Sequence, residues 1–410
     1  MRHRLLALLI AVAVAVAIVI VIAIPRLAAV FGRGLDPADT AKTSTTTDGV
    51  AFKTAWGDPD FEGIWTYDHQ IPLQRPEKYA GKEFFTDAEI AELDRLRAGQ
   101  QRQDYRAQRG TEADVSGAYN TVFLTIRPTG RRTSLIVDPP NGRVPPLTPE
   151  AQKRINADRE FRLALLQATE TCKNREAGCA GGKYGPPSPR RAEVPPAYLT
   201  AAVNRSDGPE DRSLGERCMG GLLPDFGTEF GGSYRRIVQA PGSVAILYDV
   251  GQGQGFPRTI PITTEPHLSS NVRQRFGDSR GHWEGNTLVV DVTNFTPKTN
   301  FQGSHENLHL VERWTRTGPN TLDYLVTIED PTTWTRPWTV KQEMSKQSDE
   351  ANRIYSEPRC HEGNFGMPAL LKGARAVEKA FAEGRGPDPA TMCTAGCSQG
   401  PADETIDPLQ

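Results

Sequence analysis

The sequence has almost no excess charge of either sign. Its 48 Lys and Arg residues oppose 50 Asp and Glu residues, for a formal net charge of −2 at pH 7. It also lacks a basic stripe interleaved with aromatic residues, the pattern that favours contact with a nucleic-acid backbone. Nucleic acid is therefore excluded as an expected partner.

The sequence also lacks the short motifs of several enzyme classes. It contains no GxSxG nucleophile elbow, no P-loop, no GxGxxG after a predicted strand and no CxxCH haem attachment site. Residues 251–255, GQGQG, predict a flexible loop and nothing more. We expect no cofactor, and a nucleotide-dependent enzyme is disfavoured.

One long apolar run is present. Residues 5–24 are uninterrupted by any polar side chain and follow Met1-Arg2-His3-Arg4, and about 20 apolar residues span the core of a bilayer. The run predicts either an uncleaved N-terminal membrane anchor or a signal peptide cleaved near Leu27-Ala28-Ala29. Both alternatives export the rest of the chain, so we expect a periplasmic protein that is anchored to the inner membrane or released from it.

The sequence has six cysteines and no CxxC motif. In an exported chain such cysteines indicate disulfides rather than a metal site. Short spacing favours two local bridges and leaves one long-range pair: Cys172–Cys179, Cys393–Cys397 and Cys218–Cys360. Other pairings remain formally possible, because proximity in the sequence is the only basis of this assignment.

Four regions follow from composition and pattern. Residues 1–30 form the leader, 31–58 a flexible linker, 59–385 a globular domain and 386–410 a tail with a local cysteine pair. Within the domain, short alternating strands flank turn sequences, which predicts a mainly β fold. We expect an antiparallel, lipocalin-like (calycin-like) barrel or a sandwich with a few peripheral helices, because Gly63-x-Trp65 is typical of the first strand of such barrels.

Local signals place the individual elements. A capping box at Thr86-Asp87-Ala88-Glu89 starts a helix whose apolar residues Ile90, Leu93 and Leu96 recur at helical spacing. Further helices are predicted from Thr148 to Cys172 and over Pro368–Glu383. Strands are predicted at 121–126 and 133–137, which we expect to pair with each other, and at 235–239, 243–249, 288–292, 308–316 and 321–329.

The segment His305-Glu306-Asn307-Leu308-His309 matches HExxH, which on a helix binds zinc and uses its glutamate as a base. Here residues 310–316 alternate as in a strand, where side chains at i and i+4 lie about 13 Å apart. A zinc hydrolase is therefore a minor alternative, and we assign no metal ligand.

Charged residues concentrate in the segments 207–217, 277–284, 329–338 and 360–364. The segment 277–284 reads as turn-rich. In a barrel, strand ends and their loops meet at one rim, so groups distant in sequence converge there. A bridge between Cys218 and Cys360 would also bring the first and last segments together. The alternative is that these charges are ion pairs that brace loops and that the tryptophans belong to the core.

His309 is the candidate general base, because it begins a strand among apolar neighbours, where burial would lower the pKa of an imidazole. The candidate catalytic residues are carboxylates and imidazoles: His309, Asp278, Glu362, His361, Glu329 and Asp330. The candidate substrate-binding residues supply guanidinium groups and indole rings: Arg280, Arg336, Trp283, Trp334 and Arg212.

Two classes of function fit these residues. The charged segments favour an exported small-molecule enzyme, a lyase, isomerase or hydrolase that acts by carboxylate and histidine acid–base catalysis. The missing nucleophile, metal and cofactor motifs favour a non-catalytic periplasmic ligand-binding or envelope protein with a barrel pocket. In both, the expected partner is a small apolar or aromatic molecule.

Several phrases occur in order over roughly residues 58–385: PDFEGIWT, GDSRGHWEGNTLVVDVTNF, EDPTTWTRPWT and CHEGN. By these phrases the chain resembles a broad family of uncharacterised exported proteins of Gram-negative soil and marine bacteria. The resemblance implies export but no particular reaction.

Overall fold

A computed structural model describes residues 52–101, 127–173, 183–198, 204–227, 234–251, 254–348, 360 and 365–392. All of them belong to the second of the two units into which the chain divides, Ala51–Gln410. The predicted leader and the predicted strand at 121–126 lie outside these ranges. Within the described ranges, no helix is long and apolar enough to cross a membrane.

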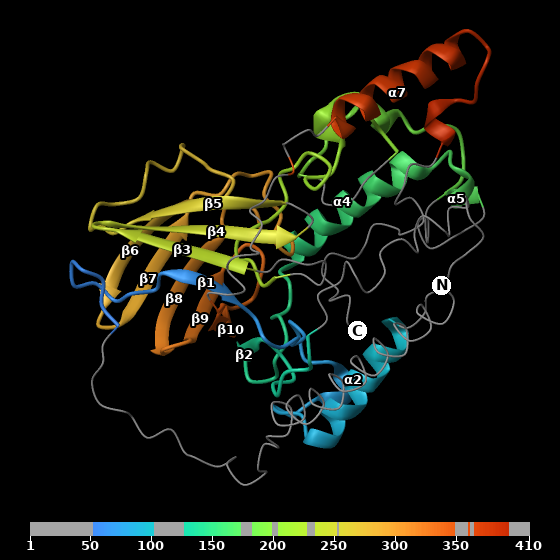
Figure 1. Cartoon of the computed structure of the whole chain (residues 1–410). Coiled ribbons are helices and arrows are strands. Elements are labelled where there is room, and N and C mark those ends of the chain that lie inside the picture. The colour runs from blue at the N-terminus through green and yellow to red at the C-terminus, as the bar shows by residue number, and fades with distance from the viewer. Residues whose placement is uncertain are drawn as a thin grey trace, which may run out of the picture. The chain divides into compact units, whose positions relative to one another are not determined.

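The described strands form one antiparallel sheet (Figure 1). They are β1 (Gly63–Thr66), β2 (Ile136–Asp138), β3 (Tyr234–Ala240), β4 (Ser243–Gly251), β5 (Gln254–Pro261), β6 (Asp278–Glu284), β7 (Thr287–Thr293), β8 (His309–Gly318), β9 (Thr321–Glu329) and β10 (Trp338–Lys346). Their order is β5-β4-β3-β1-β10-β9-β8-β7-β6, and β2 also pairs with β10.

The two ends of this order, β5 and β6, approach each other and nearly close the sheet into a barrel. Arg258 Nε in β5 donates a hydrogen bond to Ser279 Oγ in β6 at 3.0 Å. Just after β5, Thr263 N donates to Gly281 O at 2.9 Å, and Ile262 forms an isolated bridge with Gly281. The predicted antiparallel barrel is therefore confirmed.

Alternate residues of the strands point into the barrel and form one buried hydrophobic cluster. Val244 and Ile246 enter it from β4, and Leu310 enters it from β8. In β1, Trp65 is fully buried, and its Nε1 donates to Phe61 O at 2.8 Å. The tryptophan of the predicted opening strand is thus part of the core.

A charged pair lies inside this core. Arg258 Nη2 donates to Glu312 Oε2 at 2.6 Å, and the two side chains are 3% and 0% exposed. Arg258 Nη1 also donates to Tyr248 OH at 3.2 Å, while Tyr324 OH donates to Glu312 Oε1 at 2.8 Å. Burial raises the pKa of both tyrosines, so their phenols remain protonated next to the ion pair.

Helices lie outside the sheet (Figure 1). They are α2 (Asp87–Gln101), α4 (Pro149–Leu166), α5 (Glu170–Lys173) and α7 (Gly366–Ala382), with single 3-10 turns at Glu77–Tyr79, Pro189–Ala192, Pro209–Asp211 and Pro389–Thr391. The capping box of α2 is confirmed, because Thr86 N donates to Glu89 Oε2 at 2.7 Å and Glu89 N donates to Thr86 Oγ1 at 3.3 Å.

The helix predicted from Thr148 to Cys172 is in fact two helices, α4 and α5. Thr148 caps α4, since its Oγ1 accepts from Ala151 N at 3.1 Å. The interruption centres on Thr169, whose hydroxyl donates to Leu166 O at 2.7 Å and accepts from Cys172 N at 3.3 Å. One hydroxyl thus closes the end of α4 and caps the start of α5.

Two strand predictions also need correction. The predicted strand at 133–137 is reduced to β2 (Ile136–Asp138), which pairs with β10. The segment 277–284, predicted to be turn-rich, instead contains the regular strand β6, which pairs with β7 along its whole length.

Candidate functional site

The predicted rim lies at the end of the barrel where β6 and β8 begin and β7 and β9 end. Strand pairing places Asp278 opposite Thr293 and His309 opposite Glu329. The side chain of His309 lies on the outer face, since the next residue, Leu310, points into the core. The predicted residues Asp278, His309 and Glu329 therefore share one edge of the barrel.

Five side chains form a hydrogen-bonded row along this edge, which we call the histidine–carboxylate chain. His309 Nδ1 lies 3.4 Å from Glu329 Oε2, and His309 Nε2 lies 3.0 Å from Asp291 Oδ2. Asp291 Oδ1 lies 2.8 Å from His267 Nε2, and His267 Nδ1 lies 2.8 Å from Asp278 Oδ2. His309 thus contacts the predicted Glu329 directly and is linked to Asp278 through two further residues.

The charges of this row favour a protonated histidine. The hydrogen bond to Asp291 raises the pKa of His309, and the same bond lowers the pKa of Asp291. The expected lowering of the pKa of His309 is therefore wrong. Burial does act to lower this pKa, but the hydrogen bonds to Asp291 and to Glu329 outweigh it. Both ring nitrogens are engaged, whereas a general base needs one nitrogen directed at its substrate.

Among the described residues, no group of three His, Cys, Asp or Glu side chains could hold a metal ion. His305 lies before β8 in a segment that is not helical, with Nδ1 3.1 Å from Pro297 O. The geometry therefore gives no support to a zinc hydrolase built on His305 and His309.

Sequence reasoning missed two members of the row. Asp291 is a polar residue at an outward position within the apolar segment Leu288–Val292, and this interruption was a usable signal. His267 lies in the connection between β5 and β6, 11 residues before Asp278, and no pattern in the sequence marks it.

The two candidate tryptophans each pack against another aromatic ring. Trp334 is buried and packs edge-on against Trp338, with ring centroids 5.5 Å apart. Trp283 packs against Phe61 at 5.4 Å, near the hairpin that joins β6 to β7. The alternative that these rings belong to the core therefore fits the structure.

Two of the three candidate arginines, Arg280 and Arg336, lie at different places on the surface. Arg280 adjoins the histidine–carboxylate chain, with Nη1 3.3 Å from Asp278 Oδ1. Arg336 instead pairs with Asp138 Oδ2 at 2.5 Å, where both side chains are about half exposed. Only Arg280, of these two, belongs to the rim.

Asp330 shapes the turn after β9. It is buried, its Oδ2 accepts hydrogen bonds from Ser304 Oγ and Thr333 Oγ1 at 2.6 Å each, and its Oδ1 accepts from Thr332 N at 2.8 Å. Burial works to raise the pKa of Asp330, but these hydrogen bonds outweigh it and lower the pKa. Asp330 is thus held as a carboxylate that fixes the loop and is a poor proton donor.

The predicted long-range disulfide is present. Cys218 and Cys360 are bonded, with their Cα atoms 5.4 Å apart. Cys172 is also disulfide-bonded, but its predicted partner Cys179 and the predicted pair Cys393–Cys397 lie outside the described residues. The candidate residues His361 and Glu362 lie outside them as well.

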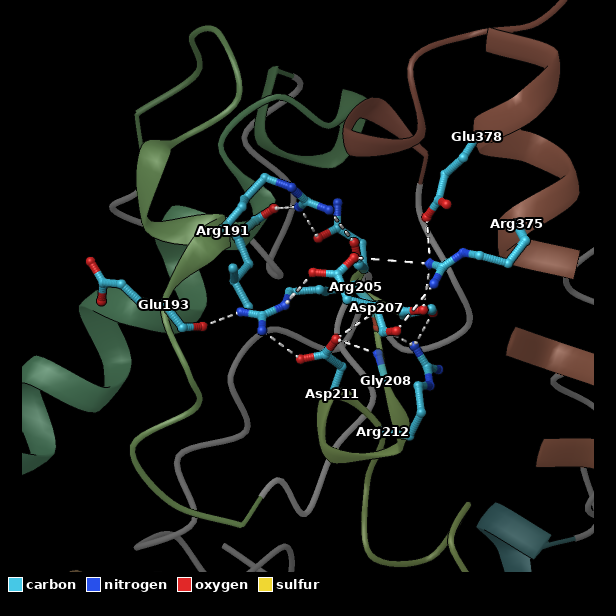
Figure 2. Close-up of polar contacts among 12 residues, drawn as sticks. Arg191, Glu193, Arg205, Asp207, Gly208, Asp211, Arg212, Arg375 and Glu378 are labelled. Atoms are coloured by element: carbon cyan, nitrogen blue, oxygen red, sulfur yellow. Dashed lines mark hydrogen bonds and ion pairs between the residues drawn. The ribbon is translucent and has the colours of Figure 1, made fainter. Parts of the chain in front are cut away.

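In the segment before Cys218, arginines and carboxylates form a dense cluster (Figure 2). Arg205 Nη2 lies 2.9 Å from Asp211 Oδ1, and both side chains are buried. From α7, Arg375 donates to Ser206 O at 2.8 Å and to Asp207 O at 3.1 Å. This cluster, which we call the arginine cluster, ties α7 to the segment before Cys218.

The candidate residue Arg212 belongs to the arginine cluster (Figure 2). It is 1% exposed, and it donates to Arg205 O at 2.9 Å and to Glu216 Oε1 at 2.6 Å. The guanidinium of Arg212 is thus engaged by groups of the protein itself. This supports the alternative that the charges of this segment are ion pairs that brace loops.

A concave site lies elsewhere, between α2 and the segment from residue 72 to 85. Its volume is about 510 Å³. The lining is mainly apolar and comprises Pro72, Pro76, Glu77, Lys78, Tyr79, Phe85, Leu93, Leu96, Arg97 and Thr129. The apolar stripe that predicted α2 therefore supplies one wall of this cavity, through Leu93 and Leu96.

Comparisons with known proteins identify no family for this chain and give only weak structural similarities. No family model matches the chain, and no curated protein matches it. Fatty-acid-binding protein 1 of Echinococcus granulosus aligns with a TM-score of 0.20 and 8% identity, over 28% of this chain and 71% of that one. Secretory abundant heat soluble protein 4 of Ramazzottius varieornatus aligns with a TM-score of 0.19 and 13% identity, over 28% of this chain and 69% of that one. The fluorescent protein UnaG aligns with a TM-score of 0.18 and 11% identity, over 28% of this chain and 72% of that one. Similarity at this level does not relate the function of this chain to theirs.

Proposed function

We propose that this protein binds a small apolar or aromatic molecule without transforming it, in the cavity between α2 and residues 72–85. The cavity itself carries the proposal. Its volume of about 510 Å³ lies in the range of roughly 300–1,000 Å³ typical of small-molecule sites, and apolar walls with a few polar groups are typical of them too.

The histidine–carboxylate chain supports a binding protein better than an acid–base enzyme. Each ring nitrogen of His309 and of His267 faces a carboxylate oxygen within 3.4 Å. Neither imidazole therefore directs a nitrogen toward a bound molecule, as a general base must.

We further propose that the protein works outside the cytoplasm, with residues 5–24 as its membrane anchor or signal peptide. The disulfide between Cys218 and Cys360 supports this location, because structural disulfides persist in oxidising compartments such as the periplasm.

Filling the cavity tests the proposed binding. Leu96 lines the cavity and is 46% exposed, so Leu96→Trp adds volume there without disturbing the core. We expect the Kd for the neutral apolar probe N-phenylnaphthylamine to rise at least about tenfold, equivalent to about 1.4 kcal/mol. Fluorescence titration of the probe measures this.

The matched control is Leu268→Trp, which makes the same change at a residue that is 41% exposed and not part of the cavity lining. It should leave the Kd as in the parent protein. Equal affinities for the parent and Leu96→Trp, or equal losses in both variants, would place the probe elsewhere and remove the basis for this site.

A further inference from the structure

The cavity between α2 and residues 72–85 is lined by charged side chains as well as apolar ones. Lys78 and Arg97 are the cations of this lining, and Glu77 is its carboxylate. Lys78 and Glu77 belong to the 3-10 turn Glu77–Tyr79, whereas Arg97 belongs to α2. The two cations therefore reach the cavity from two different elements.

Lys78 has no carboxylate partner among the described residues. Its ammonium lies 4.8 Å from the centroid of the Tyr79 ring, and the residue is exposed. Lys82, a few residues later in the same segment, instead pairs with Glu89 at 2.5 Å. Lys78 thus brings to the cavity a positive charge that the described part of the fold does not neutralise.

Arg97 is fixed through one end of its guanidinium. Its Nη1 donates to Arg127 O at 3.2 Å and to Thr129 Oγ1 at 3.1 Å, and lies 3.2 Å from Asp94 Oδ1. Its Nε and Nη2 have no hydrogen-bond partner within the described ranges, and the side chain is 19% exposed. A guanidinium presents five N–H donors in one rigid plane. The other two nitrogens can therefore donate to an acceptor in the cavity.

The carboxylates of this region leave the lining itself positive. Asp94, the partner of Arg97, is not a lining residue, and its Oδ1 also accepts from Thr129 N at 2.8 Å and from Thr129 Oγ1 at 2.6 Å. Glu77 is then one carboxylate against the two cations of the lining, which gives the lining a net charge of +1. A positive charge beside apolar walls attracts anions and disfavours cations.

We propose that the molecule bound in this cavity carries one anionic group, such as a carboxylate or a sulfonate, on its apolar or aromatic body. This inference rests on the proposed function, since it names the class of ligand for the same cavity. Lys78 and Arg97 bind the anionic group, while Leu93 and Leu96 contact the body. Hydrogen bonds from a guanidinium to an anion are roughly twice as strong as neutral ones, so the anionic group fixes the orientation of the ligand.

Two fluorescent probes that differ only by a sulfonate test this inference. 8-Anilinonaphthalene-1-sulfonate has the ring system of N-phenylnaphthylamine and one added negative charge. In Lys78→Gln we expect the Kd of the sulfonate to rise about fivefold, because one exposed charge partner is lost. The Kd of the neutral probe should stay as in the parent protein, which also shows that the variant is folded. Leu96→Trp should weaken the binding of both probes, since their bodies occupy the same space.

The matched control is Lys153→Gln. Lys153 is an exposed lysine of α4 that does not line the cavity. This variant should bind both probes as the parent protein does. The inference is wrong if Lys78→Gln binds the sulfonate as tightly as the parent protein, or if Lys153→Gln loses as much affinity as Lys78→Gln.

The parent protein gives a second readout that needs no variant. Raising NaCl from about 20 mM to about 500 mM screens exposed charges, so the Kd of the sulfonate should rise several-fold while that of the neutral probe does not rise. A Kd of the sulfonate that is independent of salt would equally overturn the inference.

Failure of this inference differs from failure of the proposed function. If Leu96→Trp weakens the neutral probe but Lys78→Gln leaves the sulfonate unaffected, the apolar site stands and the anionic group is rejected. If Leu96→Trp leaves both probes unaffected, the cavity is not the binding site and both proposals fall.

Discussion

Replacing Arg258 with methionine is expected to lower the free energy of unfolding by about 3–5 kcal/mol. The reason is the ion pair inside the barrel. Arg258 is the cation that faces Glu312, which is fully buried in β8 at 2.6 Å from it. The variant would leave a carboxylate in the core without its counter-ion, and an uncompensated buried charge is strongly destabilising. Urea unfolding measures the loss.

The matched control for this experiment is Arg313→Met. Arg313 follows Glu312 in the same strand but lies on the outer face, where it pairs with Glu284 at 2.5 Å in a half-exposed position. Its loss should be far smaller, because solvent screens such a pair. The double variant Arg258→Met/Glu312→Leu should recover much of the stability, since apolar side chains replace a buried pair well. Similar losses for Arg258→Met and Arg313→Met would contradict this account of the core.

Removing the disulfide by Cys218→Ser/Cys360→Ser is the second change with a large expected effect. The bond closes a loop with a sequence separation of 142 residues. In the chain-entropy model, a loop of that length stabilises the folded state by about 5 kcal/mol, because it restricts the unfolded chain. We expect urea unfolding of the double variant to begin at a correspondingly lower concentration.

The control for the disulfide is the effect of a reductant on each protein. Dithiothreitol should destabilise the parent protein strongly and the double variant much less, since the largest loop is already open in the variant. An unchanged unfolding midpoint in the double variant would show that the arginine cluster alone holds the segment before Cys218 in place. Equal sensitivity to reductant in both proteins would assign the effect to other cysteines.

The sequence predicts the hairpins of the barrel well, because their signals are local. Residues 235–239 and 243–249 flank the turn sequence Pro241-Gly242, and the structure has β3 and β4 there. The opposite case is β6. Its inward positions include Ser279 and Gly281, and a Cβ on Gly281 would lie 2.9 Å from side-chain atoms of Ile260 and Ile262. The close approach of β6 to the end of β5 requires glycine at position 281. A glycine and a serine at inward positions interrupt the alternation of apolar and polar residues by which a strand is recognised.

The candidate site was predicted only in part, for a related reason. His309 and Glu329 lie at the ends of predicted strands and Asp278 lies in a segment read as turn-rich, so all three could be assigned to one rim. The link between them could not be predicted, because it depends on His267, which reaches Asp278 and Asp291 from a long connection without periodicity. The burial of the His309 side chain was also predicted wrongly. His309 has apolar neighbours in sequence, yet they point into the barrel while its ring stays on the outer face.

Strand order has a consequence for the time course of synthesis. The ribosome makes β1 before any other described strand, and β1 joins two groups of consecutive strands, β3–β5 on one side and β6–β10 on the other. Each group pairs between neighbours in sequence and forms as soon as its own residues emerge. Trp65 and Thr66, however, pair with Lys346 and Ser345, which are translated more than two-thirds of the chain later. The first strand to be made is therefore the last to be completed, and an incomplete nascent chain carries an unpaired β1 edge for most of its translation.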